Sequence, residues 1–425
     1  MDKKSLIAEI LCTGEELLLG DIVNTNAAFL SAELTKLGAC VYHHSVVGDD
    51  SARLADCVSE GLSRSDIVIV SGGLGPTKDD LTKETVGALF GRKMMLHEES
   101  LEAIKSYFAK TNRVMSKNNE KQAMMPEGAI VFPNHYGTAP ALALENDKGQ
   151  SVIMLPGPPS ELIPLFFEQV VPYIKSKSPI AIVSRNIHFF GIGESALAEH
   201  LDGFLIDTPS LTAATYCKEG EVRIRITARD ISESVALNAC EAYADKIIST
   251  DVGSFVYGID VGTIENAVVK ALHKSGLTLS AAESCTGGLI SKRVTDISGC
   301  SDVFFGGCVT YTNDVKQRLI GVSAQTLEQY GAVSMQTACE MARGVRLATG
   351  SDIGVSATGI AGPTGGTPET PVGTVFIGIS TKNGESYRKL SLSPMRSREY
   401  IRLASATNAF DMVLKAIEGY SKANS

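Results

Sequence analysis

The sequence predicts a multi-domain α/β protein, with a doubly wound N-terminal domain, a small α+β connector and an α/β C-terminal domain. Three observations lead to this prediction. Strand-like and helix-like segments alternate through residues 1–172, alternating apolar and polar residues mark 173–258, and strand, glycine turn and helix follow one another again in 259–425. At about 150 residues per domain, a chain of 425 residues has room for roughly three domains.

Short apolar runs in the first domain alternate with segments whose apolar residues recur at helical spacing. Helices of this length between strands indicate βαβ units and therefore a parallel sheet. The expected strands are 6–11, 39–47, 66–70, 129–132, 141–144 and 152–155, and the expected helices are 24–37, 51–63, 81–90 and 161–171.

The pattern of polar and apolar residues changes after the first domain. The polar segment 175–179 ends in proline and is expected to be a linker. In 221–227, valine and isoleucine alternate with arginine, which is typical of a strand in a half-buried antiparallel sheet. Connector helices are expected at 194–201 and 233–248; in the C-terminal domain, helices are expected at 263–274 and 397–417 and strands at 277–282, 352–356, 374–380 and 386–391.

Composition excludes several classes of protein. The 39 Lys and Arg against 48 Asp and Glu give a net charge of −9, which argues against non-specific binding of nucleic acid. The nine cysteines are scattered without a CxxC pair, so a reducing cytoplasm is expected rather than a disulfide framework or a structural zinc site. No run reaches the ~18 apolar residues of a membrane span. We therefore expect a soluble cytoplasmic protein with no membrane partner.

The first glycine cluster follows the predicted strand 66–70. Small residues at the carboxyl end of a strand let backbone amides approach an anion, and ligands of open α/β sheets bind at that edge. Two carboxylates follow the glycines, and a Mg²⁺ ion between carboxylate and phosphate would reconcile their charges. The alternative is an ordinary loop in which one of these aspartates caps the helix 81–90. The residues concerned are Gly72, Gly73, Gly75, Asp79, Asp80 and Thr82.

The loop after the first strand is expected at the same edge of the sheet. Either Glu15 or Glu16 can complete a metal site there. Asn24 and Asn26 can each bind a ligand or cap the helix that follows. The Pro-Gly-Pro-Pro run at 156–159 ends another strand, and its expected role is a rigid turn.

The second glycine cluster, 281–288, again joins a strand to a helix. Ser284 and Cys285 are both conceivable nucleophiles in this turn, where a helix N-terminus can stabilise an oxyanion. The C-terminal domain has one histidine, His273, and it lies on the helix before the strand. A serine–histidine triad is therefore not expected.

Lys316 is the better candidate for a base. A buried lysine loses its proton near neutrality and can activate Ser284, with Tyr311 relaying or positioning. The alternative places Lys316 on a solvated helix face and Tyr311 in the core.

The third cluster, 358–366, follows another predicted strand. Thr358, Gly359 and Gly362 suit a cradle for phosphate or ribose. The alternative is a flexible surface loop. Guanidinium groups near the start of the last helix can contribute to phosphate binding; the candidates are Arg396, Arg398 and Arg402.

Taken together, these motifs resemble the competence/damage-inducible protein A (CinA) family over essentially the whole chain. No single glycine loop is as specific as their combination. The resemblance rests on the segments 14–26, 71–82, 156–162, 282–288, 309–316 and 359–366.

The first domain resembles the molybdopterin-binding fold, with Leu74 where the cofactor enzymes have threonine. In this family the resemblance implies a metal-dependent ADP-ribose pyrophosphatase, with Mg²⁺ as the expected metal. The metal would be held by Asp80, Asp79 and Glu16; the substrate would contact Gly72, Gly73, Gly75, Thr82 and Asn24.

The third domain resembles the nicotinamide-nucleotide amidase of the same family, which hydrolyses nicotinamide mononucleotide (NMN) to nicotinic acid mononucleotide and ammonia without a cofactor. The resemblance maps its serine, tyrosine and lysine to Ser284, Tyr311 and Lys316, and Ser301 is a second hydroxyl candidate. Oxyanion donors are expected at Thr286, Gly287 and Gly288, and the NMN phosphate is expected near Thr358, Gly359, Gly362 and Arg402.

Two wider expectations follow from the resemblance. Family members assemble, so a homodimer is expected. The non-enzymatic alternative is a nucleotide- or pterin-binding adaptor in competence or the DNA-damage response.

Overall fold

The computed structural model describes residues 6–177, 181–218 and 220–423. The described residues form two compact units: the first comprises 6–177, 181–184, 209–211 and 227–240, and the second comprises 185–208, 212–218, 220–226 and 241–423. Among the described residues, no helix has the length and apolar character needed to cross a bilayer.

The N-terminal domain is built on a six-stranded sheet in the order β2-β1-β3-β8-β7-β6. The first four strands are parallel, whereas β7 and β6 run antiparallel to their neighbours. The four parallel strands confirm the predicted βαβ units, and the antiparallel edge arises because the short connection between β6 and β7 leaves no room for a crossover helix. The strands are β1 (Ile7–Thr13), β2 (Cys40–Val47), β3 (Ile67–Ser71), β6 (Ile130–Phe132), β7 (Ala141–Glu145) and β8 (Ser151–Leu155).

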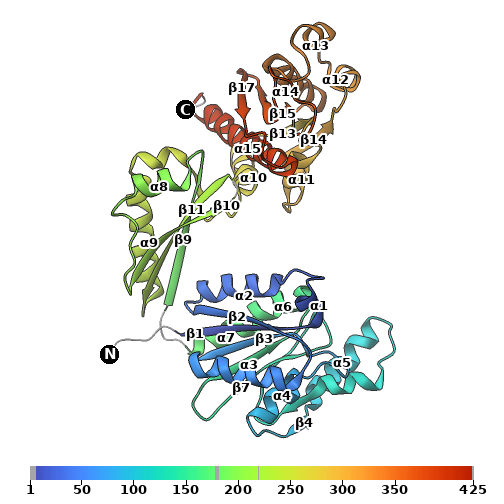
Figure 1. The fold of residues 1–425 in the computed structure, drawn as a ribbon, viewed down its shortest axis with the longest axis vertical. Coiled ribbons are helices and arrows are strands. Elements are labelled where there is room, and N and C mark those ends of the chain that lie inside the picture. The colour runs from blue at the N-terminus through green and yellow to red at the C-terminus, as the bar shows by residue number, and fades with distance from the viewer. Residues whose placement is uncertain (1–5, 178–180, 219, 424–425) are drawn as a thin grey trace. The chain divides into compact units, whose positions relative to one another are not determined.

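Helices cover both faces of this sheet, which confirms the doubly wound architecture (Figure 1). One core contains Leu30 and Leu34 of α2 (Thr25–Lys36) together with α6 (Pro159–Leu165). The opposite core contains residues of α3 (Ser51–Arg64) and α4 (Thr82–Leu89).

The helix predicted at 161–171 is longer than expected. A π-helical segment, η2 (Phe166–Val170), connects α6 to α7 (Val171–Lys177), so the chain stays helical through the first part of the predicted linker. Residues 178–179 of that linker lie outside the described residues.

One insertion in this domain was not predicted. It comprises the antiparallel strands β4 (Met94–Leu96) and β5 (Met124–Pro126), the helix α5 (Glu98–Lys110) and the 3₁₀ helix η1 (Lys117–Ala123). A short helix, α1 (Glu15–Leu19), was missed as well.

The connector contains a sheet in the order β10-β11-β9-β12 with two helices. Val222, Ile224 and Ile226 are buried and Arg223 is exposed, which confirms the predicted alternation along β11. The elements are β9 (Ala181–Phe190), α8 (Glu194–His200), β10 (Leu211–Lys218), β11 (Glu221–Asp230), α9 (Glu233–Ile248) and β12 (Val256–Ile259).

The C-terminal domain has a five-stranded sheet in the order β14-β13-β15-β16-β17. Strands β14, β13 and β15 are parallel to one another. Strand β16 runs antiparallel to β15, and β17 runs antiparallel to β16. The strands are β13 (Leu279–Glu283), β14 (Phe304–Val309), β15 (Ile353–Gly359), β16 (Thr374–Thr381) and β17 (Gly384–Ser391).

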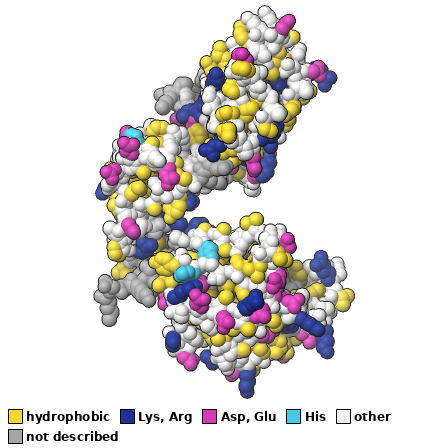
Figure 2. All heavy atoms as spheres, in the orientation of Figure 1, with side chains coloured by type: hydrophobic (Ala, Val, Ile, Leu, Met, Phe, Trp, Pro, Cys, Tyr) yellow, Lys and Arg dark blue, Asp and Glu magenta, His cyan; other side chains and the backbone are white. Residues whose placement is uncertain are grey.

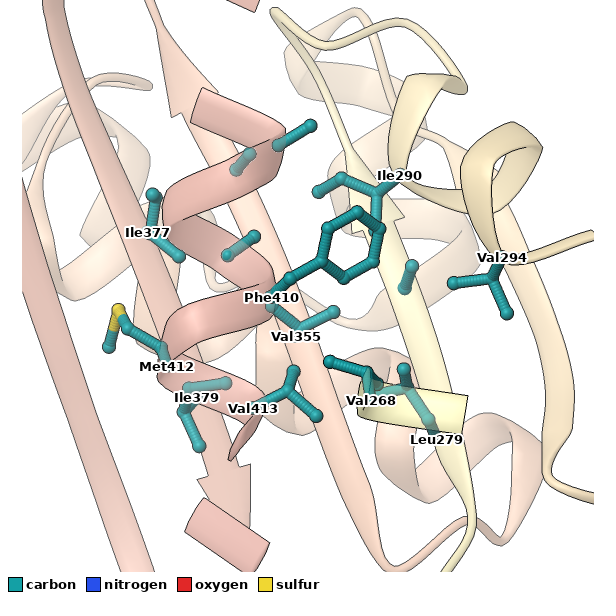
Figure 3. Close-up of a cluster of buried hydrophobic side chains, with 14 of the residues drawn as sticks. Val268, Leu279, Ile290, Val294, Val355, Ile377, Ile379, Phe410, Met412 and Val413 are labelled. Carbon is teal, nitrogen blue, oxygen red and sulfur yellow. The ribbon is translucent and has the colours of Figure 1, made fainter. Parts of the chain in front are cut away.

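The two faces of this sheet carry different helices. On one face, Phe410 and Val413 of α15 (Arg398–Ala423) pack with α10 (Ile264–Ser275) and α11 (Leu289–Thr295) (Figure 3). The other face is covered by α14 (Met335–Thr349), which the sequence reading did not identify, with α12 (Asn313–Ile320) and α13 (Ala324–Tyr330).

On the visible surface, Lys and Arg side chains are interspersed with Asp and Glu (Figure 2).

Candidate active sites

Ser284 follows β13 at the carboxyl edge of the C-terminal sheet. Its amide donates to the carbonyl of Ala357 at 2.9 Å, and its carbonyl accepts from the amide of Gly287 at 3.1 Å, so both ends of the residue are fixed. Gly287 and Gly288 have φ values of 59° and 92°, which glycine adopts at little cost. The strand therefore ends in a tight turn that holds Ser284 in a defined position.

Lys316 reaches this turn from α12. Its side chain is 1% exposed, which rules out the solvated-face alternative. Nζ lies 3.2 Å from Ser284 Oγ, 2.8 Å from the carbonyl oxygen of Thr310 and 3.4 Å from that of Tyr311. Burial lowers the pKa of Lys316 below the usual lysine value.

These three contacts are compatible with the neutral amine that a base requires, and equally with an ammonium that donates to all three oxygens. A neutral lysine has two N–H groups, which the two carbonyls can accept, and one lone pair, which can take the proton of Ser284 Oγ. The arrangement can therefore supply a serine nucleophile with its base.

Glu283, which sequence reasoning missed, is fully buried beside this pair. Its carboxylate accepts from the amides of Ile290 (3.0 Å) and Ser291 (2.8 Å) and from Ser291 Oγ (2.7 Å). The first amides of α11 therefore already donate to a carboxylate, and they are not available for the oxyanion stabilisation that the sequence predicted.

Oxyanion donors must then come from the turn itself. Of its predicted donors, the amide of Gly287 is used within the turn. The amide of Thr286 faces the thiol of Cys285, whereas the amide of Gly288 donates to no protein oxygen in the described part of the chain. The Oγ1 atom of Thr286 is likewise buried without a hydrogen-bond partner.

Tyr311 lies at the rim of the site and not in the core. Its side chain is 59% exposed, and its hydroxyl accepts a hydrogen bond from Arg398 Nη2 at 3.2 Å. Arg398 Nη1 also donates to the carbonyl of Gly362 at 2.8 Å. Tyr311, Arg398 and the third glycine cluster therefore meet at one edge.

Three other residues were predicted to contact the phosphate, and each of them makes contacts within the protein. Arg402 donates from Nε (3.1 Å) and Nη2 (2.7 Å) to the carbonyl of Thr286, and thereby braces the Ser284 turn. Thr358 is buried, and its hydroxyl donates to the carbonyl of Ala332 at 2.6 Å. Gly359 is the last residue of β15, pairing with Val375.

Two alternative nucleophiles do not fit this site. Ser301 is exposed in η4 (Cys300–Asp302), before β14, and the parallel register of β13 and β14 puts it at the opposite edge of the sheet from Ser284. Cys285 is buried, and burial raises the pKa of its thiol to about 12, which keeps it from forming the reactive thiolate.

The second candidate site is a cavity of about 320 Å³ at the carboxyl edge of the N-terminal sheet. Asn24, predicted to contact substrate, caps α2 by accepting from the amide of Ala27. Asn26 instead bridges the strand ends: its Nδ2 donates to Ser71 Oγ (3.0 Å) and to the carbonyl of Gly157 (2.6 Å). The Oδ1 atom of Asn26 is buried without a hydrogen-bond partner.

The loop 71–82 borders this site. A Cβ atom at Gly72, where φ is 111°, would lie 2.5 Å from Thr13 Oγ1, so the neighbouring strand end requires glycine there. Thr82 closes the loop by donating from its amide to the carbonyl of Gly73 (3.2 Å) and from Oγ1 to that of Gly72 (2.9 Å).

Three successive amides of this loop remain available. In the described part of the chain, the amides of Gly73, Leu74 and Gly75 donate to no protein acceptor. Consecutive free amides of this kind form a concave site for an anion.

The carboxylates near the loop are arranged differently from the prediction. Asp80 folds back and accepts from the amide (2.8 Å) and Oγ1 (2.6 Å) of Thr77 through Oδ2. Neither aspartate caps α4, whose N-cap residue is Leu81. Asp79 is exposed, and Glu16 is exposed with its carboxylate folded over Gly14.

Asp49 is an additional carboxylate that sequence reasoning missed. Burial raises its pKa, and the charges of Glu16, Glu15 and Asp80 add to this effect, so these four groups are neighbours. Among the described residues, however, no three histidine, cysteine or carboxylate side chains are placed to hold a metal ion. A resident ion held by the protein alone does not fit. An Mg²⁺ ion that arrives with phosphate groups needs only one or two carboxylates.

Known protein families match three successive segments of the chain. Family models match residues 9–176 (probable molybdopterin binding domain), 184–258 (damage-inducible protein CinA KH domain) and 261–417 (CinA C-terminal domain).

Full-length relatives are similar along nearly the whole sequence. A competence-damage inducible protein of Acetivibrio thermocellus is 47% identical over 410 residues, covering 96% of this chain and 98% of the relative. A CinA-like protein of Kosmotoga olearia is 44% identical over 410 residues, with the same coverage. A crystal structure of a competence/damage inducible protein from Agrobacterium tumefaciens is 41% identical, covers 36% of this chain and 93% of that one, and has a TM-score of 0.35. The chain belongs to the CinA family of competence/damage-inducible proteins.

Proposed function

We propose that the C-terminal domain is an amidohydrolase that converts NMN to nicotinic acid mononucleotide and ammonia. The observation that carries this proposal is the contact of 3.2 Å between Lys316 Nζ and Ser284 Oγ, with the amine's other neighbours being uncharged carbonyls. The choice of NMN over other carboxamides rests on the resemblance of the motifs to the family's amidase.

The first half-reaction forms an acyl-enzyme. Lys316 Nζ takes the proton of Ser284 while Oγ bonds to the carboxamide carbon, and the oxyanion forms near the free amide of Gly288. The C–N bond then breaks, and the proton on Lys316 passes to the leaving nitrogen, which departs as ammonia.

The second half-reaction consumes one water molecule. Lys316 takes a proton from the water, whose oxygen bonds to the acyl carbon, and returns it to Ser284 as the Oγ–C bond breaks. The product carries the carboxylate, and the enzyme is restored. We assign the phosphate of NMN to the rim formed by Arg398 and 359–366, because Arg402 is engaged with the carbonyl of Thr286.

The test is release of ammonia from NMN by the full-length protein. Ser284→Ala and Lys316→Met are each expected to lower kcat by about 10³-fold or more. Ser301→Ala is the matched control, because it removes a serine hydroxyl at the opposite edge of the same sheet, and it should leave the rate unchanged. Full activity of Ser284→Ala would overturn the assignment. Binding of NMN without turnover by the unaltered protein would favour the adaptor alternative.

We further propose that the N-terminal domain binds the pyrophosphate of ADP-ribose at the free amides of Gly73, Leu74 and Gly75 and cleaves it with a divalent metal. The metal would arrive with the substrate and be held by Asp80 and Asp49, and its contribution is to polarise a phosphoryl oxygen. The chain's own amides bind the anion, and Asp80 fixes the loop through Thr77.

Cleavage of ADP-ribose tests this second assignment. Activity should disappear on chelation and return with added Mg²⁺. Asp80→Asn should lower kcat/KM by about tenfold or more, because Asp80 orders the loop as well as facing the substrate, whereas Asp79→Asn, at an exposed side chain, should change it little. A rate unaffected by chelation would refute the metal proposal.

A further inference from the structure

Two lysines hydrogen-bond the backbone next to the loop 71–82, and the proposed reactions use neither. Lys83, in α4, is 2% exposed, and its Nζ donates to the carbonyls of Lys121 (3.0 Å) and Gln122 (2.9 Å). Lys121 donates in turn from Nζ to the carbonyls of Thr77 (2.8 Å) and Asp80 (2.5 Å). Lys83 thus holds the backbone of residues 121–122, and Lys121 holds the backbone of residues 77 and 80. We call this pair of lysines the lysine latch.

The segment that carries Lys121 is itself held firmly. In η1, Asn119 is buried, and its Oδ1 accepts from the amide (3.1 Å) and Oγ (2.8 Å) of Ser116. Its Nδ2 donates to Gln122 Oε1 at 3.1 Å. The carbonyl of Ala123 accepts from the amide of His97 at 2.9 Å. Lys121 therefore projects from a fixed support.

The loop depends on this support. Between residues 75 and 81, the internal hydrogen bonds are those between Thr77 and Asp80. Among the described residues, Lys121 is the one side chain from outside 71–82 that hydrogen-bonds to this stretch. Its bonds are charge-assisted, and such bonds are stronger than those between neutral groups.

Lysine suits these positions although burial of an ammonium is costly. The carbonyls of Thr77 and Asp80 need donors, and an apolar side chain at 121 would leave them without any from the protein. The side chain of Lys121 is 25% exposed and lies 3.9 Å from Glu84, so part of its charge stays solvated and balanced.

We propose that Lys121, supported by Lys83, is a positioning residue of the N-terminal site: it fixes 75–80 so that the amides of 73–75 are arranged before an anion binds. Donors that are arranged in advance need no reordering on binding, which improves affinity. The proposal deepens the assignment of these amides to a pyrophosphate and rests on it.

The experiment compares Lys121→Met, Lys121→Arg and the exposed Lys117→Met of the same 3₁₀ helix in the full-length protein. Lys121→Met should raise KM for ADP-ribose about tenfold while kcat changes less than twofold, and should raise the dissociation constant of inorganic pyrophosphate by a similar factor. Lys121→Arg should recover most of the loss, because a guanidinium can also donate to two carbonyls. Lys117→Met should behave like the unaltered protein. An unchanged KM in Lys121→Met would overturn the proposal.

A second readout separates the latch from the proposed activity. In the absence of any ligand, Lys121→Met should speed hydrogen–deuterium exchange of peptides covering 72–82 at least threefold, while exchange in β1 and β3 stays the same. If the unaltered protein neither binds nor cleaves ADP-ribose, the functional assignment fails, and faster exchange still establishes the latch. Equal exchange in both proteins would refute the latch even where ADP-ribose is cleaved.

Discussion

At the scale of single residues, Lys316 is distinguished by the uncharged partners of its side-chain nitrogen, although the titratable thiol of Cys285 and the carboxylate of Glu283 lie nearby. Its side-chain nitrogen faces the carbonyl oxygens of Thr310 and Tyr311 and the hydroxyl of Ser284, all of them uncharged groups. Desolvation therefore lowers the pKa of Lys316 from its ordinary value of 10.5. A lysine in such a place can serve as a base at a pH where exposed lysines stay charged.

The pH dependence of ammonia release follows from this environment. The base must be unprotonated to accept the proton of Ser284, so kcat/KM for NMN should rise with pH through the lowered pKa of Lys316. The ascending limb should lie below pH 10.5, and it is measured by assays across the neutral and alkaline range. Activity that falls with rising pH over this range would contradict a lysine base.

The sequence supplies the types of these residues but not their distance. Ser284 and Lys316 are 32 positions apart, and they meet because β14 pairs with β13 in parallel and returns the chain to the same edge. Glu283 was missed because its role depends on where α11 begins. Tyr311 was expected as a helper in the reaction, whereas its hydroxyl faces Arg398 at the rim.

At the scale of elements, Glu283 ties the end of β13 to the start of α11. Its buried carboxylate accepts three hydrogen bonds, so Glu283→Gln would turn one acceptor into a donor that faces donors. The free energy of unfolding of the C-terminal domain should fall by about 2 kcal/mol, and ammonia release should fall with it because the Ser284 turn loosens. Urea unfolding followed by circular dichroism measures the first effect. Glu328→Gln, on an exposed side chain of α13, is the matched control. Equal stability of the two variants would refute this role.

The contribution of Lys83, in α4, to the free energy of unfolding depends on pH. Burial lowers its pKa to about 8, against 10.5 for an ordinary lysine. Between these values the unfolded chain binds more protons than the folded one, so the contribution of Lys83 to stability rises with pH. A neutral amine keeps two N–H groups, enough for the two carbonyls that Lys83 contacts.

The measurement is the difference in free energy of unfolding between the unaltered protein and Lys83→Met. From pH 8 to pH 10 this difference should shift in favour of the unaltered protein, by up to about 1.4 kcal/mol per pH unit. Comparing the two proteins cancels the other groups that titrate in this range. A constant difference across the range would show that the pKa of Lys83 is not lowered.

The sequence predicts some helices and strands well and misses others. Apolar runs marked most strands of the two large sheets, since a strand covered on both faces has few polar residues. The insertion around α5 was missed because that helix buries only Ser100 and Ile104, which leaves a weak periodic signal. The buried apolar residues of α14, by contrast, recur at helical spacing, so the sequence carries the pattern of this helix; they are Ala338, Met341, Ala342 and Val345.

At the scale of the whole molecule, each of the two proposed sites stands on a sheet with helices on both of its own faces. The Ser284 turn takes its hydrogen bonds from residues of the C-terminal domain, and the loop 71–82 takes its bonds from residues of the N-terminal domain. Mutations at distant sites without shared partners usually act independently.

The two proposed activities should therefore be separable within the intact chain. Ser284→Ala should abolish release of ammonia from NMN and leave the rate of ADP-ribose cleavage within twofold of the unaltered protein. Asp80→Asn should lower ADP-ribose cleavage by about tenfold or more and leave ammonia release within twofold. The double variant should show each loss at the size measured in the single variants, because the effects add when the sites share no partner. Both reactions are measured on the same preparations, and the thermal unfolding of each variant is compared with that of the unaltered protein to identify misfolding. A single substitution that lowers both rates while the thermal unfolding of the protein stays unchanged would show that the sites are coupled, and would refute their independence.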